Sequence, residues 1–189
     1  GPCLVKSLPL TCPNLYVSSA VRAIVTRNGT DQRRITDLST PTPEAIKYRN
    51  TQFLRDPEHP YETGLDDDPE RLRRKIWNVR NGDLRRLFRQ FPVQEPLPRQ
   101  CAHWVHAVVG KHFFPDANHR TAIATLRRLM RHNDIYPPAW PVDRLRTARK
   151  ESHTIRGEVD PIRLDTLYRR DRLHDRWYEF FTAVDLTTE

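Results

Sequence analysis

The sequence predicts an all-α domain. Apolar residues recur at helical spacing in most stretches between proline-rich breakers, and no stretch alternates apolar and polar residues as a half-buried strand does. The clearest pattern runs from Arg120 to His132, where apolar side chains lie on one side of the predicted helix and arginines on the other. The chain of 189 residues has the size of one compact domain. We therefore expect an irregular lead-in over 1–14 and a single domain over 15–189.

Each expected element begins or ends at residues that interrupt helices. Asn14 caps an expected helix from Tyr16 to Thr26, which Asn28-Gly29 ends. The Ser/Thr/Pro cluster at 37–43 and the acidic, proline-containing stretch at 56–68 predict loops. Helices are then expected over 44–54, 69–81, 83–91, 99–111, 120–132, 142–156 and 160–183. In the helix over 120–132 the apolar side comprises Ala122, Ile123, Leu126, Leu129 and Met130, and the basic side comprises Arg120, Arg127 and Arg131.

The charge of the chain favours acidic partners. Lys and Arg number 32 against 24 Asp and Glu, which gives a net charge of +8. Such a charge suits nucleotides, RNA or an acidic protein surface, and it says nothing of the fold. The three cysteines are too scattered for a disulfide framework, which indicates a reducing, cytoplasmic compartment. No apolar run approaches the roughly 20 residues that cross a bilayer, so no membrane partner is expected.

The segment from His112 to Thr121 carries the strongest functional signal. It joins two predicted helices and reads His-Phe-Phe-Pro-Asp-Ala-Asn-His-Arg-Thr. The helix that begins near Asn118 presents unpaired backbone N–H groups and the positive end of its dipole, which together bind anions. Ala117 is small enough to let a phosphate approach the backbone, and Arg120 supplies a planar fork for phosphate oxygens. The segment therefore predicts a phosphate-binding turn.

Two further residues of this segment predict chemistry at the bound phosphates. Asp116 offers a carboxylate that can hold Mg²⁺ against phosphate oxygens, the usual way in which proteins bind that ion. His112, with an ordinary pKa near ~6.5, can accept a proton from an attacking hydroxyl at neutral pH. Phe114 is expected to anchor the loop in the core. Together they indicate phosphoryl or nucleotidyl transfer, in which positioning and charge neutralisation supply most of the catalysis.

The pattern His112-x-Phe114-x-Asp116-Ala117-Asn118-x-Arg120, between helices expected over 101–111 and 120–132, resembles the signature of the Fic/Doc family. The resemblance implies a Fic/Doc-like helical domain whose central helix–loop–helix carries the motif. It also implies a transferase that uses ATP and Mg²⁺ to modify a hydroxyl of a target protein. His112 would be the base, Asp116 the Mg²⁺ ligand and Arg120 the residue that grips a phosphate. The nucleotide would also contact other residues of the loop and the first helical turn: Phe114, Pro115, Ala117, Asn118 and His119.

Two positions leave the transferred group open. Family members that transfer AMP usually have Gly where this chain has His119, and a second Arg where it has Ile123. Doc-like members carry Asp-Ala-Asn-Lys-Arg-Thr-Ala, which is closer to the segment from Asp116 to Ala122. Those members transfer the terminal phosphate of ATP to a translation factor. The resemblance thus implies a toxin-like enzyme and leaves AMPylation and phosphorylation as alternatives.

Inhibition and target docking are expected to lie outside the motif. The inhibitory pattern of the family, Ser/Thr-x-x-x-Glu-Gly/Asn, fits Thr40 to Ala45 only in part because prolines interrupt it. We expect inhibition from an antitoxin-like partner chain or from a missing N-terminal segment. Gly1-Pro2, without an initiating Met, looks like a processing or tag remnant. The loop over 53–66 is expected to be a small β-hairpin flap that docks the target as an added strand.

Two other functions compete with this interpretation. A basic RNA-binding module would account for the net charge and would bind less tightly as salt increases. The sequence lacks the interleaved aromatic and basic platform on which bases stack, so nucleic acid is the less favoured partner. An inactive domain of the same fold would bind a nucleotide or a partner without consuming ATP.

Two clusters of side chains have structural alternatives. Four residues suggest a zinc site, namely Cys101, His103, His106 and His112. Because they lack CxxC or HExxH spacing, packing between helices is their favoured role. Three arginines of the helix after the motif fit either a solvated face or an extension of the phosphate groove: Arg127, Arg128 and Arg131.

Overall fold

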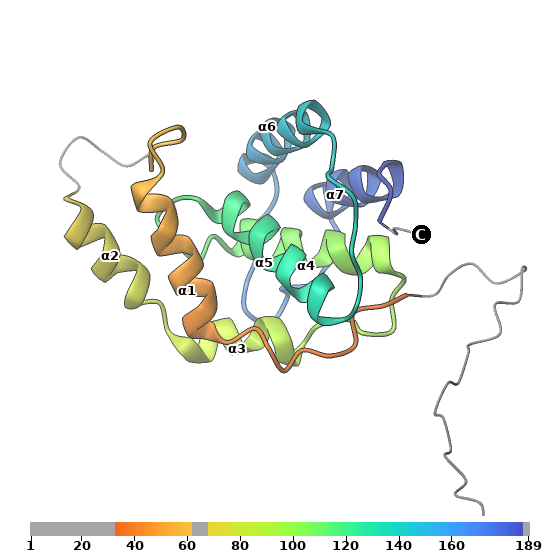
Figure 1. The fold of residues 1–189 in the computed structure, drawn as a ribbon, viewed down its shortest axis with the longest axis horizontal. Helices are drawn as coiled ribbons and strands as arrows, with labels where there is room; N and C mark the ends of the chain where they lie inside the picture. Colours follow the sequence, from red (N-terminus) through yellow and green to blue (C-terminus); the bar gives the residue numbers. More distant parts are fainter. Residues whose placement is uncertain (1–32, 62–67, 187–189) are drawn as a thin grey trace, which may run out of the picture. The chain divides into compact units, whose positions relative to one another are not determined.

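A computed structural model of the chain describes residues 33–61 and 68–186. These ranges contain seven α-helices and one short 3₁₀ helix and no strand, which confirms the all-α prediction (Figure 1). None of these helices has both the length and the apolar character needed to cross a bilayer. The elements are α1 (Pro43–Gln52), η1 (Phe53–Arg55), α2 (Pro69–Trp77), α3 (Asn81–Arg89), α4 (Leu97–Lys111), α5 (Asn118–His132), α6 (Val142–Glu158) and α7 (Arg172–Ala183).

Several sequence-based expectations fall on residues that the structure does not describe. The contacts divide the chain after Thr30, and the fold described below belongs to the unit Asp31–Glu189. The expected helix over 16–26 and the expected boundary after Asn14 lie outside the described residues. The same holds for the part of the expected flap from residue 62 onward. Over 53–61 the chain forms η1 and an irregular segment, without a strand.

Helix starts in this chain follow local chemistry. The hydroxyl of Thr42 accepts a hydrogen bond from the N–H of Ala45 (3.1 Å) and caps α1, whose first residue is Pro43. Proline also stands in the first turns of α2 and α4, where its missing N–H costs nothing. These features explain why the expected and observed helix starts agree closely in this part of the chain.

The expected single helix over 160–183 is wrong for its first half. Residues 159–171 form turns and irregular backbone, and α7 begins only at Arg172. The carboxylate of Asp171 accepts hydrogen bonds from the N–H groups of Leu173 (3.0 Å) and His174 (3.1 Å), and so caps α7. The same carboxylate bonds Nε2 of the buried His106 of α4 (3.0 Å). This tertiary contact fixes the helix start, and it has no counterpart in the local sequence pattern.

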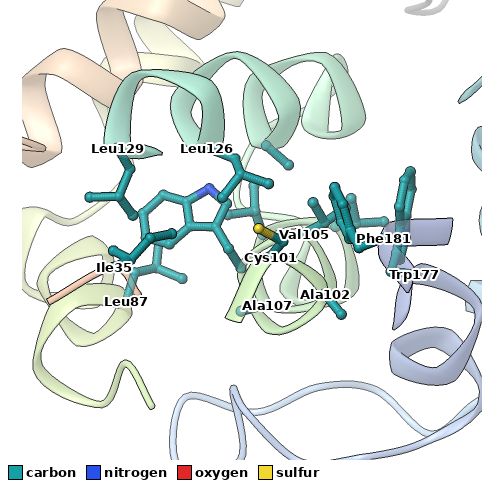
Figure 2. Close-up of a cluster of buried hydrophobic side chains, with 14 of the residues drawn as sticks. Ile35, Leu87, Cys101, Ala102, Val105, Ala107, Leu126, Leu129, Trp177 and Phe181 are labelled. Carbon is teal, nitrogen blue, oxygen red and sulfur yellow. The ribbon is translucent and has the colours of Figure 1, made fainter. Parts of the chain in front are cut away.

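Helix α4 is the centre of the core. Every residue from Gln100 to Val109 is buried, whereas the sequence had indicated only one apolar face. A helix that is buried all round must have partners on several sides. Helices α5 and α7 pack along α4, and α1 packs on α5 (Figure 1). Figure 2 shows Leu126 of α5 and Trp177 of α7 reaching the core on different sides of α4.

Helix α5 uses its predicted faces with one exception. Four of its five predicted apolar residues are buried against the core, namely Ala122, Leu126, Leu129 and Met130. The fifth, Ile123, is only partly buried and lies in the wall of a surface groove. The packing therefore rotates α5 so that the groove side of the helix, which also carries Arg120 and Arg127, remains accessible.

A substitution at Gly110 can test how tightly the segment 159–171 packs on α4. A Cβ at this position would overlap the side chain of Ile162 and approach Cδ2 of Leu173 to 3.3 Å. We expect Gly110→Ala to lower the free energy of unfolding by about 1–3 kcal/mol, because overpacking forces neighbours apart. Urea denaturation of the purified protein measures this change.

Gly157→Ala is the matched control, because Gly157 lies in α6 and a Cβ at this position would meet no atom within 4 Å. There we expect a small gain of up to about 1 kcal/mol from helix propensity. Equal stability of the two variants would show that the contact between Gly110 and Ile162 does not constrain the fold.

Candidate functional site

The predicted motif lies on the loop between α4 and α5, and both ends of this loop have left-handed backbone. His112 ends α4 with a φ of 54°, and its N–H donates to the carbonyl of Val108 (3.2 Å). Ala117 precedes α5 with a φ of 57°, and its carbonyl accepts the first helical hydrogen bond from Thr121 (2.8 Å). Residues with a Cβ adopt this backbone at a cost of roughly 1–2 kcal/mol each. Contacts elsewhere in the loop must therefore hold it.

Asn118 supplies the closest of these contacts. Its side chain is buried, and Oδ1 accepts a hydrogen bond from the N–H of Phe114 (3.1 Å). Its Nδ2 donates to the carbonyl of the same Phe114 (2.8 Å). The ring of Phe114 is itself buried in the core. The side-chain amide of Asn118 thus closes the loop through both its oxygen and its nitrogen.

Helix α1 and the segment after it hold the loop from the other side. The buried Asn50 donates through Nδ2 to the carbonyl of Asp116 (3.0 Å) and to the hydroxyl of Thr121 (2.8 Å). The hydroxyl of Tyr61 donates to Oδ1 of Asn50 (3.0 Å) and accepts from the N–H of Asp116 (3.0 Å). Burial raises the pKa of Tyr61 to about 12, so the phenol keeps the proton that it donates. The backbone of Asp116 is therefore fixed at both of its polar atoms.

A cleft of about 500 Å³ opens at the N-terminal end of α5. No side chain of the described residues caps this end, and the amides of Asn118, His119 and Arg120 precede the first helical hydrogen bond. The charges in its walls are mainly positive: Arg120, Arg146, Arg149 and Lys150 against Glu58 and Asp116. Amides at a helix start, the helix dipole and excess positive charge are together suited to a phosphate group.

Arg120 lies in the cleft wall with its guanidinium already bonded. Its Nη1 donates to the carbonyl of His59 (2.6 Å) and lies 3.3 Å from a carboxylate oxygen of Asp56. Its Nη2 lies 3.8 Å from the carboxylate of Asp116, and the guanidinium covers the ring of Phe53 at 4.8 Å. Only 13% of the side chain is exposed. A phosphate can bind Arg120 only by displacing some of these partners.

His112 is exposed beside the cleft and is not part of its wall. Partial loss of solvent contact lowers the pKa of His112 to about 4. Arg156 and His153 act in the same direction, whereas Asp116 opposes them. The sequence alone indicated an ordinary pKa for this imidazole. With the lowered pKa, His112 is neutral at pH 7 and able to accept a proton.

His119 is fixed by two residues of other helices. Its Nε2 lies 2.9 Å from the hydroxyl oxygen of the buried Ser152, which also accepts a hydrogen bond from Nε1 of Trp177 (3.0 Å). Because that hydroxyl proton is buried and needs an acceptor, it belongs on the bond to Nε2. The imidazole then carries its proton on Nδ1. Burial lowers the pKa of His119 to about 3, so it is a neutral N–H donor.

Asp116 is the residue of the loop that can hold Mg²⁺. Its side chain is 29% exposed and lies in the cleft wall. Within the described residues no group of three or more His, Cys, Asp or Glu is placed to hold a metal ion. Mg²⁺ often takes one or two carboxylates and completes its shell with substrate phosphates and water. A single carboxylate in the wall of this basic cleft therefore fits Mg²⁺ that is bound together with a nucleotide.

The structure brings five of the eight predicted site residues into one cleft wall: Asp116, Ala117, Asn118, His119 and Arg120. His112 lies beside this wall, and Pro115 is half-buried outside it. The side chain of Phe114 is buried in the core and cannot contact a ligand in the cleft.

Several residues of the site were not found by sequence reasoning. Asn50, Asp56, Tyr61 and Ser152 each contact the motif from a distant part of the chain. Asn50 is a polar residue at a buried position of α1. A polar residue on the apolar side of a predicted helix is the signal that could have indicated its role. Asp56 lies in the acidic, proline-containing loop, where one carboxylate cannot be told from the next.

The histidines of α4 serve packing, the role favoured from the sequence over zinc. His103 and His106 are buried against His174 of α7, and the rings of His103 and His174 lie 4.3 Å apart. His106 bonds the carbonyl of Leu167 (3.2 Å) and the carboxylate of Asp171. Burial lowers the pKa of His103 to about 3. These side chains join α4 to α7 and take no part in the cleft wall.

Comparison of the sequence with protein-family models, with curated proteins and with solved structures finds no match. The assignment of function therefore depends on the residues and geometry of the cleft.

The ion pair between Arg120 and Asp56 is expected to compete with phosphate binding. Removing the Asp56 carboxylate frees the guanidinium without removing a residue of the cleft wall. Because a partly exposed pair contributes about 1 kcal/mol at most, we expect Asp56→Asn to raise nucleotide affinity by up to about fivefold. Isothermal titration calorimetry with ATP and Mg²⁺ measures the change.

Glu58→Gln is the matched control, because it removes an equal charge from the cleft wall and Glu58 is not among the described residues that bond Arg120. A gain of the same size in both variants would mean that net charge, and not release of Arg120, determines the affinity.

Proposed function

We propose that the protein binds ATP with Mg²⁺ in the cleft at the N-terminus of α5 and transfers AMP or phosphate to a hydroxyl of a target protein. The observation that carries this proposal is the meeting of helix amides, Arg120 and Asp116 in one basic cleft. A neutral histidine, His112, lies beside that cleft. The Fic/Doc-like fold, the toxin-like role and a translation factor as target follow from the sequence resemblance and form part of the proposal.

Both transfers share one proton movement. The target hydroxyl attacks a phosphorus atom of ATP, and its proton passes to the imidazole of His112 and then to water. Attack at the α-phosphorus forms the bond to AMP and releases pyrophosphate. Attack at the γ-phosphorus forms a phosphate ester and releases ADP. Arg120 and the first amides of α5 would stabilise the charge on the phosphate oxygens, and Asp116 would hold Mg²⁺, which neutralises phosphate charge.

Phosphate binding requires Arg120 to change partners. Its present acceptors, Asp56 and the carbonyl of His59, belong to the segment that follows η1. Guanidinium binds phosphate through two parallel hydrogen bonds, which compensates for the loss of a partly exposed ion pair. The segment with Asp56 and His59 must therefore move away from Arg120 when a nucleotide enters the cleft.

Nucleic acid is less favoured than a nucleotide as the ligand. Single-stranded nucleic acids gain affinity by stacking bases on open aromatic faces. Near the cleft, the ring of Phe53 is covered by the guanidinium of Arg120 at 4.8 Å. The ring of Trp140 is covered by Arg127 at 4.5 Å. An RNA would have to bind these surfaces through its phosphates alone.

Transfer of label from ATP tests the proposed function. The protein is incubated with cell lysate, Mg²⁺ and ATP labelled at either the α- or the γ-phosphorus. We expect one protein band to gain label, from the α position if AMP is transferred and from the γ position alone if phosphate is. His112→Ala should reduce labelling by about 10²–10⁴-fold, the usual contribution of a general base.

His132→Ala controls for loss of a histidine, because His132 lies at the other end of α5 and pairs with Asp37 (3.0 Å). Asp116→Asn should abolish the Mg²⁺-dependent labelling. Absence of label from both positions with the unaltered protein would exclude the transferase function.

The pH dependence of transfer tests the role of His112 as base. Its folded-state pKa is depressed, so the base form is present above about 4 and is lost only below that pH. We expect kcat/KM for transfer to be flat above about pH 5 and to fall with an apparent pKa of about 4. Arg156→Gln removes a positive neighbour and should move the acid limb to higher pH. An acid limb near 6.5 in both proteins would contradict this assignment.

A further inference from the structure

A groove of about 330 Å³ continues from the cleft along α5. Its walls come from α1 and η1 on one side and from α6 on the other, with α5 as its floor. The groove and the cleft share three residues, namely His119, Arg120 and Arg149. A ligand whose phosphates lie at the N-terminus of α5 can therefore extend into the groove without leaving the protein surface.

The far end of this groove carries a pair of arginines. Arg127 and Arg131 are one helical turn apart on α5, and both also line a smaller cavity of about 260 Å³. No Asp or Glu lies among the described residues that line either space. Like charges at this spacing on a helix repel each other. An anion between the two guanidinium groups would remove that repulsion.

Two buried hydrogen-bond donors at this place have no acceptor in the described part of the chain. They are Nε of Arg127 and Nε1 of Trp140. The guanidinium of Arg127 lies over the ring of Trp140 at 4.5 Å, so these donors are neighbours. Buried donors without an acceptor are uncommon in native proteins, and each is a reason to look for a ligand. Arg127 lines the groove and Trp140 does not, so an oxyanion bound in the groove lies beside the Nε of Arg127, which lacks an acceptor among the described residues.

Apolar side chains line much of the groove between its two basic ends. They are Phe53, Ile123, Ala124 and Leu145, and Arg49 of α1 lines the groove beside them. At a helical rise of about 1.5 Å per residue, the backbones of Arg120 and Arg127 are about 10 Å apart and those of Arg120 and Arg131 about 16 Å. The long side chains shorten these separations. The groove thus offers two anion sites with an apolar stretch between them.

We propose that Arg127 and Arg131 form a second oxyanion site, and that it binds the 3′-phosphate of a nucleotide whose 5′-phosphates lie at the N-terminus of α5. This inference rests on the proposed function for the position of the first phosphates. The ribose, which joins the two phosphates, and the base attached to it would occupy the apolar stretch. The substrate class is therefore a nucleotide phosphorylated at both the 5′ and the 3′ position.

A comparison of two adenosine nucleotides tests the proposal by titration calorimetry at fixed salt. Adenosine 3′,5′-bisphosphate should bind about tenfold more tightly than adenosine 5′-monophosphate, the effect of one charge-assisted contact. Arg131→Gln should remove this preference and leave the affinity for the monophosphate unchanged. Arg127→Lys keeps the positive charge and loses the planar guanidinium, so it should remove part of the preference for the bisphosphate.

Arg128→Gln is the matched control, because Arg128 is an exposed arginine of α5 that lines neither space. Equal affinities of the two nucleotides for the unaltered protein would overturn the proposal, as would an equal loss in the Arg128→Gln variant. Inorganic phosphate that binds in an Arg131-dependent way without any preference for the bisphosphate would also overturn it, since the ligand is then a free anion. If the protein binds neither of these nucleotides, nor ATP with Mg²⁺ in the same titration, the proposed function itself fails.

Discussion

The side-chain amide of Asn118 provides the contact on which the site depends. Its two hydrogen bonds to the backbone of Phe114 close a loop whose ends, His112 and Ala117, both have left-handed backbone. With the loop closed, the first amides of α5 lie in the cleft wall, and Asp116 and Arg120 are placed one turn apart. Without that closure, the positions of the carboxylate and the guanidinium would not be defined relative to the helix end. A residue expected to touch the ligand thus acts mainly by shaping the loop.

The sequence predicted those features that depend on neighbours along the chain. The helix α5 and the motif before it are local patterns, and both were found with nearly correct bounds. What was missed depends on contacts between distant segments. The break before α7 follows from the capping by Asp171, and the support of the loop follows from Asn50 and Tyr61. The lowered pKa of His112 likewise arises from partial loss of solvent contact and from Arg156 and His153, which approach it only through folding.

The arginines of α5 at the cleft and the groove could exchange their present contacts for contacts with an anion. Near the loop, Arg120 is bonded to protein acceptors that a phosphate can replace. Near the other end of the helix, Arg127 stacks on Trp140 and keeps a buried donor for which the described residues supply no acceptor. Between them, burial and the nearby Arg149 lower the pKa of His119, which is therefore neutral. Seven basic and two acidic residues line the cleft and the groove, so positive charge exceeds negative charge along this side of α5.

The support of the cleft by segments far apart along the chain has a consequence for biosynthesis. The loop needs Asn50, which is made early, and the first turn of α5 needs Ser152 and Trp177, which are made late. Chains emerge from the ribosome N-terminus first, and domains fold as units. While the segments that form α6 and α7 have not yet left the ribosome, the cleft of the nascent chain is therefore incomplete. Any activity of the cleft would therefore begin only after α6 and α7 have folded against the rest of the chain.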